Sequence, residues 1–198
     1  MPSIYKASLD KCSLKLAESR IIAGLLLDGV DAAAWNRAII DDNVLQMRSP
    51  SAAKTYAYYI RQRLNTMQPG LWKLVHEGPI ITATHAVLAA EIKHSRLLAD
   101  FFIYVVHEQL RQFKTTITVK EWMEFMQSCA SRDPHVLAWT PVVFNRLRQI
   151  SFRILAESGY VTDTRSMTLQ RVLVAPEVVR YLEENGEQDV LRCMQVTL

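Results

Sequence analysis

Two long stretches of the sequence carry basic side chains and no acidic residue, and the first covers residues 43–76. Within it, Lys54, Tyr58 and Arg61 are spaced at i, i+4 and i+7, so a helix places them on one face. Serine hydroxyls and exposed backbone N–H groups at the start of such a helix favour phosphate binding. This chemistry is typical of DNA recognition, in which arginine contacts base edges and lysine or serine contacts the backbone. The predicted DNA contacts here are Arg48, Ser49, Ser51, Lys54, Tyr58, Arg61 and Arg63.

The second stretch, residues 134–156, has the same character and is followed by a further acid-free segment at residues 164–176. In a winged helix, a basic helix lies in a groove of the duplex while the wing contacts the backbone. The predicted contacts are Arg146, Arg148 and Arg153 on the helix, with Arg165 and Arg171 in the wing. As an alternative to DNA binding, either stretch by itself is also consistent with a solvent-exposed face of an ordinary helical bundle. The presence of both in one short chain is what favours DNA binding.

Signals for catalysis are weak. The sequence contains no P-loop, dinucleotide-binding, nucleophile-elbow or H-E-x-x-H motif. His85 and His94 are nine residues apart, which places them on different faces of a helix and argues against a metal site. The cysteines Cys12, Cys129 and Cys193 form no C-x-x-C pair, which suits a reducing compartment. We therefore expect no enzyme activity, no metal, no cofactor and no small-molecule substrate.

The basic residues of the first stretch need helices to position them, and the sequence predicts three. Apolar residues recur at helical spacing over residues 13–28, 32–43 and 50–67. Asp31 is a suitable N-cap for the second helix, and Ser49 followed by Pro50 is a suitable start for the third. Three short helices with a basic face on the third predict a helix-turn-helix-like module over residues 1–68.

The remainder of the chain is expected to form a central helical connector over residues 69–114 and a C-terminal module over residues 115–198. In that module, Thr118 with Glu121, and Thr140 with Pro141, are signals for helix starts. Short apolar segments on both sides of a polar turn at residues 162–168 predict a β-hairpin, and a helix at 176–184 follows. The predicted fold is mainly α: a helical bundle with helix-turn-helix-like modules and a small C-terminal β-hairpin, as in a winged helix.

The totals are compatible with this picture. The chain has 198 residues, of which 49% are hydrophobic, so it can bury a sizeable core. A formal net charge of +3 does not by itself indicate a nucleic-acid partner. The longest apolar runs are much shorter than the roughly 20 residues that span a bilayer. The sequence therefore predicts a protein of the cytoplasm without a membrane partner.

Several short runs of residues follow one another along the chain in an order that can be compared with known families. The first half contains ESRIIAGLLL at residues 18–27, Trp35, DNVLQMRS at residues 42–49 and RQRL at residues 61–64. The second half contains Lys93, RLLADF at residues 96–101 and LAESG at residues 155–159. Together these runs resemble the BrxA family of bacteriophage exclusion (BREX) defence islands, over residues 13–182. No run is a catalytic signature, so the specificity of the resemblance comes from their combination.

The resemblance implies a small helical, DNA-binding protein that acts beside other proteins encoded in the same island. It supplies no catalytic residues to carry over. The predicted function is non-enzymatic binding of double-stranded DNA in phage defence. Two alternatives remain open: an adaptor whose basic faces dock on acidic protein surfaces, with Tyr58 and Phe152 as anchors, and an RNA-binding helical protein.

Overall fold

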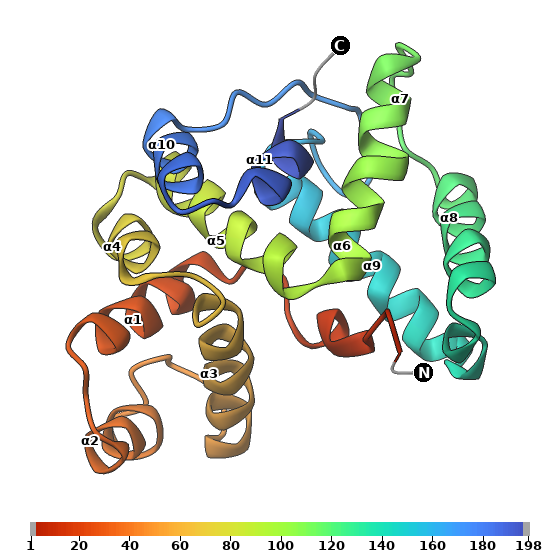
Figure 1. Ribbon diagram of the computed structural model, residues 1–198. Helices are drawn as coiled ribbons and strands as arrows, with labels where there is room; N and C mark the ends of the chain where they lie inside the picture. Colours follow the sequence, from red (N-terminus) through yellow and green to blue (C-terminus); the bar gives the residue numbers. More distant parts are fainter. Residues whose placement is uncertain (1–2, 196–198) are drawn as a thin grey trace.

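The computed structural model describes residues 3–195, and helices form the framework of that part of the chain (Figure 1). Two short π-helical segments, η2 (Arg37–Asp41) and η3 (Phe102–Val106), continue α-helices, and two 3₁₀ turns, η1 (Ala7–Lys11) and η4 (Pro134–Ala138), precede longer elements. The α-helices are α1 (Leu16–Leu27), α2 (Ala32–Asn36), α3 (Pro50–Leu64), α4 (Pro69–Glu77), α5 (Ile80–His94), α6 (Arg96–Phe101), α7 (His107–Arg111), α8 (Val119–Arg132), α9 (Pro141–Glu157), α10 (Pro176–Glu184) and α11 (Gln188–Met194).

The predicted helix starts are confirmed by the caps that the structure contains. The Ser49 hydroxyl accepts the N–H of Ala52 at 3.2 Å, and Pro50 occupies the first turn of α3. The capping box at the start of α8 is complete, because the Glu121 carboxylate also accepts the backbone N–H of Thr118 at 2.8 Å. These bonds satisfy N–H groups that have no partner inside a helix, and they fix where each helix begins.

The core is organised around α5, in which every residue from Thr82 to Ile92 is buried. Figure 1 shows α1, α2 and α3 gathered at one end of the molecule and α7 and α8 at the other, with α5 between them. The apolar residues that follow α5 belong to the same core, since Leu97, Phe101 and Val106 are all buried. Phe101 packs edge-on against Trp122 of α8, with ring centroids 5.1 Å apart. One apolar cluster thus includes residues from each third of the chain.

The predicted C-terminal β-hairpin, and with it the winged helix, is wrong. Within the described residues the polar turn is flanked only by isolated antiparallel bridges, Val161 with Leu169 and Thr116 with Thr168. The chain after Gln170 leaves the turn instead of pairing along it, because the Ala175 N–H is bound to Nδ1 of His85 on α5 at 3.0 Å. Leu173, expected in a strand, is 90% exposed. The β-branched run therefore serves as an extended crossover to α10.

Residues 3–5 lie against the C-terminal half of the chain. The Asp133 carboxylate, between α8 and η4, accepts the backbone N–H groups of Ile4 and Tyr5 at 2.8 and 3.0 Å. These bonds hold the pKa of Asp133 well below its usual range. The first turn, η1, then packs against α9. Among the described residues, no helix is both long and apolar enough to cross a bilayer.

Candidate nucleic-acid interface

A basic groove lies between the N-terminal segment, α3 and α9. We call residues 11–15 the strap, since this short segment joins η1 to α1 and forms one wall of the groove. The cavity has a volume of about 780 Å³. None of the described residues that line it carries a carboxylate. Its cationic side chains are Lys11 and Lys15 from the strap and Arg146, Arg148 and Arg153 from α9.

The opposite wall is one face of α9. Val142, Asn145, Gln149 and Arg153 recur at three- and four-residue spacing, so a straight helix aligns them along the groove. The helix starts where the sequence predicts, with the Thr140 hydroxyl bound to the N–H of Val143 at 3.4 Å. Two amides therefore stand among the α9 arginines. Amides and guanidinium groups are the side chains that proteins use against phosphate oxygens and base edges.

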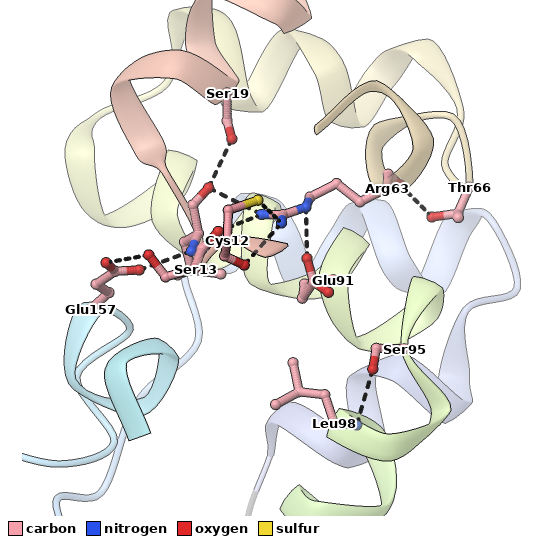
Figure 2. Close-up of polar contacts among 10 residues, drawn as sticks. Cys12, Ser13, Ser19, Arg63, Thr66, Glu91, Ser95, Leu98 and Glu157 are labelled. Carbon is pink, nitrogen blue, oxygen red and sulfur yellow. Dashed lines mark hydrogen bonds and ion pairs between the residues drawn. The ribbon is translucent and has the colours of Figure 1, made fainter. Parts of the chain in front are cut away.

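The strap is held from both sides (Figure 2). From α9, the Glu157 carboxylate accepts the Ser13 hydroxyl at 2.8 Å and the Leu14 N–H at 2.9 Å. From α3, the Arg63 guanidinium donates to the carbonyl oxygens of Ser13 and Leu14 at 2.8 and 3.2 Å. Lys15 follows in a left-handed backbone conformation, with φ of 53°. A non-glycine residue keeps such a conformation only where its surroundings fix it.

Lys15 stands at the junction of the groove with its surroundings. Its ammonium lies 3.0 Å from the Glu18 carboxylate and 5.0 Å from the centre of the Tyr56 ring. Partial burial alone lowers the pKa of Lys15, but the hydrogen bond and the charge of Glu18 raise it above its ordinary value overall. The side chain is therefore a cation whose charge is partly offset by one neighbouring acid.

Arg63, one of the predicted DNA contacts, lies inside the protein, and its side chain is only 3% exposed. Its Nε atom lies 2.6 Å from the carboxylate of Glu91, which is equally buried on α5. Its terminal nitrogens contact the strap, including the Cys12 Sγ at 2.9 Å. Figure 2 shows the guanidinium between Glu91 and the strap. Arg63 thus joins α3, α5 and the strap inside the protein.

The other predicted contacts of the first stretch lie on two different sides of α3. Lys54, Tyr58 and Arg61 are exposed, but they are about half a turn around the helix from Tyr56, which faces the groove. The Arg61 guanidinium covers the Trp35 ring at 4.4 Å. Arg48 lines an adjoining cavity of about 680 Å³ that shares Lys15 and Tyr56 with the groove. Ser49 and Ser51 are exposed in the first turn.

The residues predicted on the second stretch are brought together more closely. Arg146, Arg148 and Arg153 all line the groove, and the Arg148 guanidinium lies 6.0 Å from the centre of the Phe152 ring. Arg165 and Arg171 are exposed, but neither lines the groove. The turn that contains Arg165 contributes its neighbour Thr164 instead.

Lys11 and Lys15 were not among the residues predicted from the sequence. Both lie far from the arginines in the chain, and the strap and α9 are joined by a hydrogen bond between residues 144 positions apart. No local pattern reports such a contact. The only available signal was that residues 11–15 contain two lysines and no acid ahead of an apolar helix.

The fold and the groove define a helical protein with a cationic surface built from the strap and α9, which are far apart in the chain. A family model described as BrxA matches residues 3–186. The chain therefore belongs to the BrxA family, as the resemblance predicted.

Similar proteins cover nearly the whole chain. A protein named BREX protein BrxA from Paramagnetospirillum magneticum is 47% identical over 98% of each chain. Another of that name, from Escherichia coli O9:H4, is 35% identical over 90% of this chain and 84% of its own length. A crystal structure of an uncharacterized protein from Magnetospirillum magneticum is 45% identical, with a TM-score of 0.88 over 98% of this chain and 99% of that one. The fold of this chain therefore matches that of the solved structure over nearly the whole length of both.

Proposed function

We propose that this BrxA-family protein is a component of a BREX phage-defence system and binds double-stranded DNA along the groove. The observation that carries the proposal is the gathering of five cations from the strap and α9 around a cavity whose described lining residues include no carboxylate. Basic side chains that neutralise phosphates and release counterions supply most of the affinity of non-specific DNA binding. The chemistry of the groove is suited to a nucleic-acid backbone.

The arrangement favours backbone contact over base reading. The strap lysines and α9 arginines face a common hollow, where a phosphodiester chain can approach several of them together. Asn145 and Gln149 lie on the same wall and offer amide hydrogen bonds to sugar, phosphate or a base edge. We expect binding with modest sequence preference, strong salt dependence and no requirement for a metal.

We propose that the protein acts by binding and has no catalytic reaction of its own. Burial raises the pKa of the Cys12 thiol, and it raises the pKa values of Cys129 and Cys193 to about 11. Thiols protonated at neutral pH are poor nucleophiles. Other proteins of the same defence island are the further partners we propose, in the cytoplasm where they and DNA meet.

The test is fluorescence anisotropy of a labelled duplex of arbitrary sequence, titrated with the protein at two salt concentrations. Arg146→Glu combined with Arg153→Glu reverses two charges inside the groove. Lys54→Glu combined with Arg61→Glu reverses two charges on the exposed face of α3 and is the matched control. Both variants change the net charge by the same amount, so only the location differs.

We expect the groove variant to lose binding by on the order of 100-fold, while the α3 variant loses much less, because contact charges outweigh screened distant ones. Equal losses would place the contact elsewhere or show that only net charge matters. No binding by the unaltered protein at low salt would refute the proposal. Stronger competition by duplex RNA than by duplex DNA would favour an RNA-binding function instead.

A further inference from the structure

We propose that Glu157 is a positioning residue for the groove: it holds the strap so that Lys11 and Lys15 face the arginines of α9. The inference rests on the proposed function, because it concerns how the same groove binds DNA. Glu157 does not line the cavity, unlike its α9 neighbour Arg153. It acts through the strap and makes no contact with the ligand itself.

The geometry of the carboxylate carries the proposal. Each oxygen of Glu157 has its own donor on the strap, with Oε1 accepting from the Ser13 hydroxyl and Oε2 from the Leu14 N–H. Hydrogen bonds to a charged acceptor are stronger than neutral ones. Figure 2 shows the carboxylate and Ser13 facing each other, on the opposite side of the strap from Arg63.

The two clamps are complementary in chemistry. Arg63 is a donor and binds the carbonyl oxygens of Ser13 and Leu14, whereas Glu157 is an acceptor and binds an N–H and a hydroxyl. The polar groups of two consecutive residues are therefore fixed from both sides. The left-handed backbone of Lys15 comes directly after them, and this conformation is rarely populated unless its surroundings impose it.

The position of Glu157 allows a test by the direction in which DNA affinity changes when its charge is removed. An acid beside a DNA-binding groove ordinarily repels phosphate, so neutralising it strengthens binding. A positioning acid has the opposite effect, because its loss releases two lysines from the binding geometry. In Glu157→Gln a neutral amide replaces the carboxylate: its oxygen can accept the Leu14 N–H while its nitrogen donates to the Ser13 hydroxyl, so the charge that strengthens both bonds is lost while the side-chain shape is kept.

Glu18→Gln is the matched control, since it also removes one acid beside the strap. The Glu18 carboxylate lies 3.0 Å from the Lys15 ammonium and offsets its charge. In the duplex titration we expect Glu18→Gln to bind DNA more tightly and Glu157→Gln to bind about three- to tenfold more weakly. Ser13→Ala, which removes the hydroxyl bond to Glu157 without changing any charge, is expected to weaken binding in the same direction.

Hydrogen exchange in the absence of DNA provides a readout that does not depend on the proposed function. We expect the amides of the strap to exchange about tenfold faster in Glu157→Gln, and at an unchanged rate in Glu18→Gln. If both glutamine variants bind DNA more tightly, the positioning role is refuted, and unchanged exchange in Glu157→Gln refutes the clamp itself. If the unaltered protein binds no DNA, the proposed function fails, and faster exchange would then leave Glu157 holding the strap for another purpose.

Discussion

The buried ion pair between Arg63 and Glu91 supports the most demanding prediction, which is that Arg63→Ala destabilises the whole fold. The two side chains are 3% and 2% exposed, and their charged atoms lie 2.6 Å apart. The substitution removes the positive partner and leaves the Glu91 carboxylate without it in the interior. It also removes the donors to the carbonyl groups of Ser13 and Leu14.

The expected loss follows from these contacts. Removing one partner of a buried ion pair costs about 3–5 kcal/mol, because the remaining charge is uncompensated. Total stabilities of single domains are about 5–15 kcal/mol, so the variant should retain only part of its stability. For a chain of this length, a loss of about 4 kcal/mol corresponds to a fall in Tm of roughly 8–16 °C. Urea unfolding followed by circular dichroism measures the free energy directly.

A matched double variant separates charge from packing. Arg63→Met combined with Glu91→Leu replaces the pair by apolar groups of similar size and should cost less than Arg63→Ala, since no charge is left unpaired. A loss below about 1 kcal/mol in Arg63→Ala, with a clear loss of DNA affinity per folded molecule, would refute the reasoning. That result would return Arg63 to the role of a surface contact.

Two further predictions concern single groups. Lys15→Gly and Lys15→Ala both remove the ammonium and should weaken DNA binding equally. The glycine variant should be the more stable of the two by about 1 kcal/mol, because glycine tolerates the φ of 53°. Equal urea midpoints for the two variants would contradict this. Burial lowers the pKa of His85, whose ordinary value is 6.5, so the unfolded chain binds the proton more readily. Stability should therefore be complete above about pH 6.5 and should decrease toward pH 5. Urea midpoints across this range check the sign, and a higher midpoint at pH 5 than at pH 7 would disprove it.

The helical framework could be predicted because its signals are local. Ser49 with Pro50, Thr118 with Glu121, and Thr140 with Pro141 each bind N–H groups within a few residues of themselves. Capping chemistry of this kind depends little on the rest of the protein. The starts of α3, α8 and α9 were therefore correct, even though the β-hairpin predicted after α9 was not.

The hairpin was predicted wrongly because a run of β-branched residues indicates that a segment is partly buried. It does not show whether the segment packs in a sheet or against helices. Val172 and Val174 are partly or fully buried, as a strand residue would be, yet the segment crosses to α5 with no partner strand among residues 3–195. The bond that directs it joins Ala175 to a histidine 90 positions earlier. Strand propensity describes fit to a half-buried surface, and such a surface need not be a sheet.

Arg63 shows how a charge can mislead when its helical position is ignored. It follows Tyr56 by seven residues and Ile60 by three, so it belongs to the inward side of α3 and not to the face of Lys54 and Arg61. Periodicity thus contained the signal, but its partner Glu91 comes from another helix and could not be identified from spacing. A buried arginine requires such a partner, and only the fold supplies it.

The same contacts connect the stability of the fold to the geometry of the groove. Arg63 reaches the strap from the core, whereas Glu157 reaches it from the surface, so the two clamps can be weakened independently. If both position the strap, Arg63→Ala should reduce stability and groove binding together, while Glu157→Gln should reduce binding with little effect on stability. An effect of Glu157→Gln on the urea midpoint as large as that of Arg63→Ala would mean that the strap belongs to the core and is not a separately held wall of the groove.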